Sequence, residues 1–141
     1  MKTKICLIRH GITEGNQKTL YYGSSDIPLA EEGIEMLRSL SAQEIYPDDT
    51  DAKYYTSGML RTEQTFSLIY GNREHEAFFP FREIDFGDFE MKSYGELKDD
   101  PDYQTWIGDT TGTLPPPGGE SACDFQMRVL KGFTELLQEQ E

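Results

Sequence analysis

The first half of the chain alternates short apolar runs with stretches that repeat apolar residues at helical spacing. Residues 4–10, KICLIRH, are apolar on both faces of an extended chain, which is typical of a central parallel strand covered by helices. Further strands are predicted at 52–57, AKYYTS, and at 74–81, EHEAFFPF. The spacing predicts helices over 26–45 and 58–71. This β-α-β-α-β order predicts an α/β layered domain with a largely parallel sheet.

The second half is less regular until its last helix. Ser93 and Glu96 have the spacing of a capping box and predict a short helix. The prolines of 111–119, TGTLPPPGG, disfavour both helix and central strand and predict a loop. Residues 120–141 predict a long helix, whose apolar stripe consists of Phe125, Val129, Phe133, Leu136 and Leu137. In a doubly wound fold such a helix leads into another parallel strand, so we expect the sheet to be incomplete at the C-terminus.

The composition is that of one folded domain with a strongly acidic surface. The 141 residues fit a single domain, 1–141, and a hydrophobic content of 36% is typical of a globular protein. The 13 Lys and Arg residues against 26 Asp and Glu residues give a net charge of −13. This charge argues against nucleic acid and anionic membranes as partners. A site for an anionic substrate therefore requires a local pocket built from a few arginines.

Neither the cysteines nor the N-terminus indicates a metal-binding or secreted protein. Cys6 lies in the first apolar run and Cys123 in the last predicted helix, so we expect two buried, reduced thiols. Their spacing fits no metal site, and we expect no metal. The N-terminal apolar run breaks at Arg9, which makes it too short for a signal peptide, and no segment reaches the length of a membrane span. We therefore expect a cytoplasmic protein.

Of the two histidines, His10 has the position that suggests chemistry. His75 lies among charged residues, where we interpret it as a solvated surface side chain. His10 follows the first predicted strand, and ligands of open α/β sheets bind beyond the carboxyl ends of the strands. Gly11 allows a sharp turn or the close approach of an anion to the backbone. A three-residue Arg-His-Gly match occurs often by chance, so the other motifs must decide.

Five motifs occur in order along the chain: LIRHGITEGN, GSSDIPLAEEG, TSGMLRTEQT, REIDFGDFE and PPGGES. Together they resemble the histidine phosphatase superfamily, which contains cofactor-dependent phosphoglycerate mutases and many small bacterial phosphatases. The resemblance implies a three-layer α/β sandwich with a mostly parallel sheet. It also implies a phosphohistidine intermediate formed without a metal or other cofactor.

The resemblance makes His10 the nucleophile, places Arg9 and Arg61 around the phosphate and makes Glu83 the proton donor. A neutral imidazole is a good nucleophile near pH 7, and adjacent guanidinium groups favour its neutral form. Forked guanidinium groups also suit the charge that phosphoryl transfer spreads over the equatorial oxygens. Alone, Arg61 would be interpreted as a surface side chain and Glu83 as one of many solvated carboxylates.

Three further residues belong to the resemblance. Asn16 would hydrogen-bond a phosphate oxygen without adding charge, although it also fits a residue that caps or turns the chain. Gly23 is a candidate for substrate contact. Asp26 is interpreted as structural.

The family carries a second essential histidine on a strand after the last helix, and no histidine follows His75 in this chain. We expect that the sequence is a truncation; the alternative is a natural short form without activity. The leading hypothesis is a phosphatase that acts on a small phosphorylated metabolite. The alternatives are a mutase and a phosphate-binding pseudoenzyme. The sequence predicts neither the substrate nor the oligomeric state.

Overall fold

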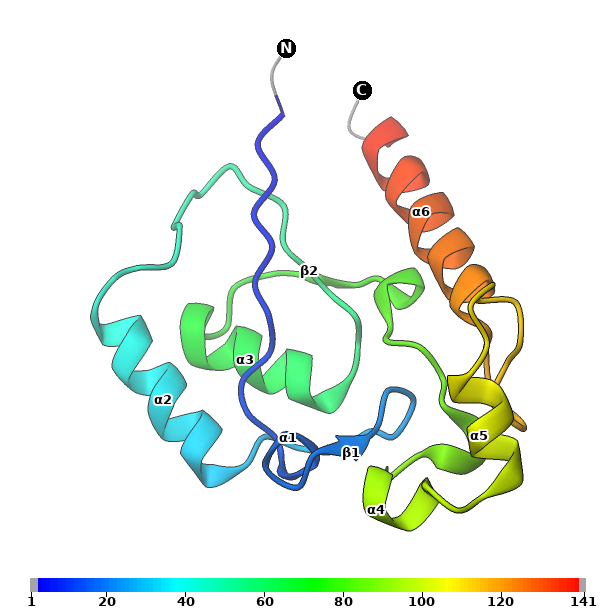
Figure 1. The fold of residues 1–141 in the computed structure, drawn as a ribbon. Helices are drawn as coiled ribbons and strands as arrows, with labels where there is room; N and C mark the ends of the chain where they lie inside the picture. Colours follow the sequence, from blue (N-terminus) through cyan, green and yellow to red (C-terminus); the bar gives the residue numbers. More distant parts are fainter. Residues whose placement is uncertain (1–2, 140–141) are drawn as a thin grey trace.

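Residues 3–139 are described by the computed structural model shown in Figure 1. Its α-helices are α1 (Glu14–Gln17), α2 (Glu31–Ala42), α3 (Leu60–Tyr70), α4 (Tyr94–Leu97), α5 (Pro101–Ile107) and α6 (Ala122–Gln138). Two short 3₁₀ helices are η1 (Phe79–Phe81) and η2 (Gly87–Phe89). The strands are β1 (Leu20–Tyr21), β2 (Tyr55–Thr56), β3 (Glu76–Ala77) and β4 (Lys92–Ser93). None of the helices within 3–139 is long and apolar enough to cross a membrane.

The strands form two short pairs instead of one broad sheet. β2 pairs with β3 in parallel, with Tyr55 opposite Glu76. β1 pairs with β4 in antiparallel, with Leu20 opposite Ser93. The prediction of a mostly parallel sheet is therefore not confirmed in the part of the chain that the structure describes, where one ladder of two is parallel.

The buried central strand predicted at 4–10 is wrong for this structure. Figure 1 shows this segment as a drawn-out trace that is neither helix nor strand. The Leu7 side chain is 89% exposed, and Cys6, expected in the core, is exposed as well. A strand needs neighbours to bond its backbone groups, and none of the strands within 3–139 pairs with this segment. Both cysteines are free, as predicted, and Cys123 is half-buried.

Helices α2 and α3 confirm the helical spacing read from the sequence and pack against each other. Leu37 is buried on the inner face of α2. Helix α3 begins at Leu60, whose amide donates to Asp26 Oδ1 at 2.7 Å, which confirms a structural role for Asp26. It ends at Tyr70, and the next residue, Gly71, has a φ of +65°, a conformation that glycine adopts without strain.

Helix α6 confirms the long C-terminal helix and packs on η1. Ser121 caps it, since the Ser121 hydroxyl accepts a hydrogen bond from the Asp124 amide. A Cβ at Gly132 would collide with Pro80, so glycine lets the helix approach η1 closely. The ring of Phe133 on α6 faces that of Phe81 in η1, with centroids 6.3 Å apart.

Helices α4, α5 and η2 enclose an aromatic core. Phe89, Leu97 and Tyr103 are buried at its centre. The hydroxyl groups of Tyr21 and Tyr103 are hydrogen-bonded at 2.7 Å, which ties β1 to α5. Burial and this hydrogen bond raise the pKa of Tyr103 to about 12. The core therefore connects the chain after His10 to the segment that carries η2.

Candidate active site

The backbone around His10 is fixed by helix α3. The Gly11 amide donates to Thr65 Oγ1 at 3.0 Å, and the Thr65 hydroxyl donates to the Arg61 carbonyl at 2.7 Å. Thr65 is buried, so water does not compete for these bonds. The loop that carries His10 is thus bonded to the first turns of the helix that carries Arg61.

The His10 imidazole is held in the tautomer and charge state of a nucleophile. Nδ1 lies 2.7 Å from the Gly11 carbonyl oxygen, which can only accept, so Nδ1 carries the proton and Nε2 keeps its lone pair. Burial lowers the pKa of His10, and the charges of Arg61 and Arg9 lower it further, against the opposing effects of the Gly11 carbonyl and Glu83. His10 is therefore neutral near pH 7, and both predicted arginines and Glu83 are close enough to act on it.

Arg61 is buried, contrary to the surface position that its sequence context alone suggests. Its side chain is 2% exposed and lies over the Tyr22 ring, 5.0 Å from the centroid. Nη1 donates to the Ser25 carbonyl at 3.0 Å and Nη2 donates to the Gly23 carbonyl at 2.8 Å. Arg61 therefore holds the loop 23–25, and its Nε–H is buried without a partner among the described residues.

Sequence reasoning missed Glu90, which binds the other side of the same loop. Its carboxylate accepts hydrogen bonds from the amides of Gly23, Ser24 and Ser25 and from the Ser25 hydroxyl at 2.6 Å. It also accepts from the Phe86 amide at 3.0 Å. The available signal was the carboxylate at the end of REIDFGDFE, but its donors lie 65 residues earlier at Ser25. Loop 23–25 is thus held between a guanidinium and a carboxylate.

The Glu90 bonds give a prediction of pH-dependent stability. Burial alone raises the pKa of Glu90, but the hydrogen bonds outweigh it and lower the pKa below the ordinary value of 4.5. Because the pKa is lower in the folded state, the stabilisation is complete above about pH 4.5 and is lost as the pH falls through the folded-state pKa. In urea unfolding, Glu90→Gln is expected to lower the free energy of unfolding at pH 7, and the difference from wild type is expected to shrink toward pH 3. The matched control, Glu74→Gln at an exposed carboxylate, should show almost no difference at either pH. A Glu90 difference that does not change with pH would contradict this role.

Gly23 lies where the loop touches the segment that carries Glu83. A Cβ at Gly23 would collide with the Ile84 carbonyl oxygen and would lie 2.9 Å from Glu83 Cγ. Its amide is bonded to Glu90 and its carbonyl to Arg61. This close approach explains the glycine by packing, and its predicted contact with substrate stays a prediction.

Asn16 caps helix α1 with its side-chain oxygen. Oδ1 accepts from the Thr13 amide at 2.9 Å, from the Thr13 hydroxyl at 3.0 Å and from the Tyr22 hydroxyl at 3.0 Å. The capping alternative weighed from the sequence is therefore confirmed for this oxygen. The Asn16 side-chain nitrogen makes no hydrogen bond within residues 3–139, so phosphate binding through that nitrogen stays a prediction.

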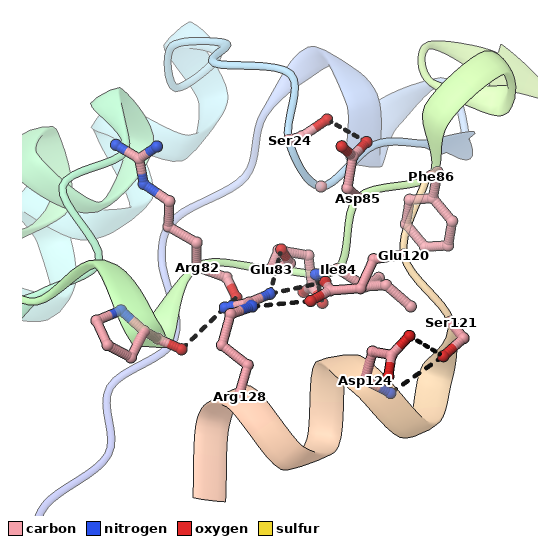
Figure 2. Close-up of polar contacts among 12 residues, drawn as sticks. Ser24, Arg82, Glu83, Ile84, Asp85, Phe86, Glu120, Ser121, Asp124 and Arg128 are labelled. Atoms are coloured by element: carbon pink, nitrogen blue, oxygen red, sulfur yellow. Dashed lines mark hydrogen bonds and ion pairs between the residues drawn. The ribbon is translucent and has the colours of Figure 1, made fainter. Parts of the chain in front are cut away.

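Glu83 lies on the segment between η1 and η2, at an open cavity of about 330 Å³. The cavity is also lined by Ser24, Arg82, Asp85, Glu120 and Arg128, several of which Figure 2 shows around Glu83. The Glu83 side chain is exposed, and Oε1 accepts a hydrogen bond from the Ile84 amide at 3.0 Å. The carboxylate is thus open to water and to a bound ligand.

His75 is not the solvated side chain predicted from its charged neighbours. It is 25% exposed, and Nε2 lies 2.7 Å from Glu63 Oε2. Its ring stacks on Phe66 with centroids 4.1 Å apart. His75 therefore joins the start of β3 to α3. In the described part of the chain, no cluster of three or more His, Cys, Asp or Glu side chains is placed to hold a metal ion.

The sequence is similar to that of known phosphoryl-transfer enzymes. Residues 5–141 match the model of the histidine phosphatase superfamily (branch 1). The chain is 32% identical to a 2,3-bisphosphoglycerate-dependent phosphoglycerate mutase of Bradyrhizobium diazoefficiens, over 93% of this chain and 66% of the relative. It is 29% identical to the adenosylcobalamin/alpha-ribazole phosphatase of Escherichia coli strain K12, over 94% of this chain and 66% of the relative. The chain thus spans slightly less than two thirds of these relatives.

Solved structures share the arrangement. The alpha-ribazole phosphatase from Shigella flexneri superimposes with a TM-score of 0.80 at 28% identity, covering 94% of this chain and 66% of the other. The phosphoglycerate mutase from Thermus thermophilus gives a TM-score of 0.69 at 33% identity, covering 90% of this chain and 68% of the other. The chain therefore has a phosphoglycerate mutase-like α/β fold.

Proposed function

This chain belongs to the histidine phosphatase superfamily, and from that premise we propose that it is a phosphatase that hydrolyses a small phosphomonoester through a phosphohistidine at His10. The observation that carries the proposal is the state of His10. Its Nδ1–H is bonded to the Gly11 carbonyl, so Nε2 is free to attack. Arg9, Arg61 and Glu83 all act on its charge. In the proposed mechanism these groups would supply a nucleophile, two cations for the phosphate and an acid.

The first proposed step transfers the phosphoryl group to His10. Nε2 attacks the phosphorus and forms a P–N bond while the P–O bond to the leaving group breaks. The developing charge on the phosphoryl oxygens is met by Arg9, by the unpartnered Nε of Arg61 and by the side-chain nitrogen of Asn16. Glu83 gives its proton to the leaving oxygen, which departs as an alcohol.

The second proposed step returns the enzyme to its starting state. The Glu83 carboxylate takes a proton from a water molecule, whose oxygen attacks the phosphorus. The P–N bond breaks, its electrons return to Nε2, and inorganic phosphate leaves. The exposed position of Glu83 supports water as the acceptor. The phosphoglycerate mutase among the relatives supports the second candidate, in which a substrate hydroxyl takes the place of water.

The test combines product analysis with trapping of the intermediate. The full-length protein is mixed with p-nitrophenyl phosphate and, separately, with phosphoglycerate. We expect release of inorganic phosphate together with an acid-labile, base-stable phosphoprotein. Isomerisation of phosphoglycerate without phosphate release would favour the mutase. Binding of phosphate with neither adduct nor product would overturn the enzyme in favour of a phosphate-binding protein.

A further inference from the structure

Arg128 on α6 contacts the Glu83 segment through its backbone. Nη1 donates to the Pro80 carbonyl at 2.9 Å and to the Arg82 carbonyl at 3.0 Å. Nη2 donates to the Glu83 carbonyl at 3.3 Å. Figure 2 shows the guanidinium rising from the helix toward these carbonyls. One side chain thus bonds three of four successive carbonyls that lead to the predicted acid.

Glu120 holds this guanidinium in place. Arg128 Nε donates to Glu120 Oε1 at 2.9 Å and Nη2 donates to Oε2 at 2.8 Å, so the pair is bidentate. The side chains of Arg128 and Glu120 are 31% and 19% exposed, which limits competition from water. The Glu120 amide also donates to the Asp85 carbonyl at 2.9 Å. The Arg128–Glu120 pair therefore fixes the chain on both sides of Glu83.

The helix that carries Arg128 is itself fixed against η1. Gly132 lies one turn further along α6, where a Cβ would collide with Pro80. This close approach sets the distance from α6 to the carbonyls that Arg128 bonds. The Glu83 carboxylate, by contrast, accepts only from the neighbouring Ile84 amide among the hydrogen bonds of the described residues. The path of the backbone therefore determines the point at the cavity from which the Glu83 side chain extends.

We propose that Arg128, oriented by Glu120, is a positioning residue that aims Glu83 at the leaving oxygen of the substrate. The inference rests on the proposed function, because it assigns Glu83 the proton transfer. The reverse view is that Arg128 only joins α6 to η1 and stabilises the fold. The two roles predict different effects of replacing Arg128: only the positioning role makes the loss of rate depend on the leaving group.

Leaving groups separate the two roles because protonation matters only for a poor one. Expulsion of an alkoxide from glycerol phosphate requires a proton from Glu83, whereas p-nitrophenolate leaves without one. A misdirected Glu83 therefore slows phosphorylation of His10 by the alkyl ester and spares phosphorylation by the aryl ester. A general loss of structure slows both to the same extent.

The experiment measures single-turnover phosphorylation of His10 by both esters in Arg128→Lys and Glu120→Gln. Lysine keeps the charge but cannot bond three carbonyls and a carboxylate. Glu120→Gln keeps the size of the side chain but weakens the bidentate pair with Arg128. The rate with glycerol phosphate is expected to fall about 100-fold, and the rate with p-nitrophenyl phosphate to stay within about 3-fold of wild type. The glycerol phosphate KM should change little.

The control is Arg73→Ala, an arginine that pairs with Asp48 away from the cavity and should leave both rates unchanged. Equal losses on both esters in the two test variants, or no loss on either, would overturn the positioning role. If wild-type protein forms no phosphohistidine from either ester, the proposed function itself fails. That outcome is distinct from failure of the Arg128 proposal, which requires an active wild type.

Discussion

Replacement of His10 by asparagine is expected to abolish turnover and phosphoprotein formation. The imidazole Nε2 that carries the lone pair is lost, and asparagine supplies no nucleophile in its place. We expect the rate with p-nitrophenyl phosphate to fall by about 10⁴-fold or more, as for the removal of other catalytic nucleophiles. The measurement is phosphate release together with trapping of the phosphoprotein by an alkaline quench, which preserves phosphohistidine.

The chain provides a clean control for the site of phosphorylation, because His75 is its only other histidine. His75→Asn removes the contact with Glu63 and is expected to cost stability, but to keep the phosphohistidine. An acid-labile, base-stable adduct that persists in His10→Asn would overturn His10 as the acceptor. Loss of the adduct in both variants would trace the effect to the fold, which thermal unfolding of each variant would show.

The elements that the sequence predicted well are those fixed by neighbours in the chain. The apolar stripe of α6 and the capping box of Ser93 and Glu96 can be predicted because residues three or four positions apart lie together on a helix. Helix α5 was missed although its signals are local, with Asp100 as the cap and Pro101 at the first position. Its apolar residues Tyr103, Trp106 and Ile107 have helical spacing, but the helix is only 7 residues long and lies in a stretch that is otherwise irregular.

The strand at 4–10 could not be predicted in the same way. Its apolar pattern indicates that the segment favours burial. A strand, however, forms only when another segment pairs with it. Leu7 is an apolar residue of the kind expected in a core strand, but it is exposed. Local sequence contains no information on whether the partner strands are present.

The candidate site shows the same division. The order of the motifs named His10, Arg61 and Glu83, and the charges of Arg61 and Glu83 both act on the pKa of His10. The sequence could not show that Arg61 is buried or that Glu90 binds loop 23–25. The hydrogen bonds of Arg61 and Glu90 to Ser25 join residues that are 36 and 65 positions apart. In the sequence, Glu90 is one of 26 acidic residues, and nothing indicates that five donors bind its carboxylate.

Replacement of Arg61 by alanine is expected to act on both stability and anion binding. The carbonyls of Gly23 and Ser25 lose their charged donor, and each such hydrogen bond contributes about 1.5–3 kcal/mol. We therefore expect the free energy of unfolding to fall by about 3 kcal/mol or more in urea. The unpartnered Nε is also lost, so the affinity for vanadate is expected to fall about 10- to 150-fold.

Vanadate titration of folded protein separates the two effects of Arg61, since loss of fold is measured independently by urea. Arg61→Lys keeps the charge beside His10 but cannot bond both carbonyls and a ligand, so both effects should persist in reduced form. Arg73→Ala removes an arginine that pairs with Asp48 and stacks on Tyr54, and it should leave vanadate affinity unchanged.

If Arg61→Ala loses stability but keeps wild-type vanadate affinity, Arg61 is a scaffold for loop 23–25 and the phosphate contact must come from elsewhere. Equal, small effects in Arg61→Ala and Arg73→Ala would contradict the buried guanidinium itself.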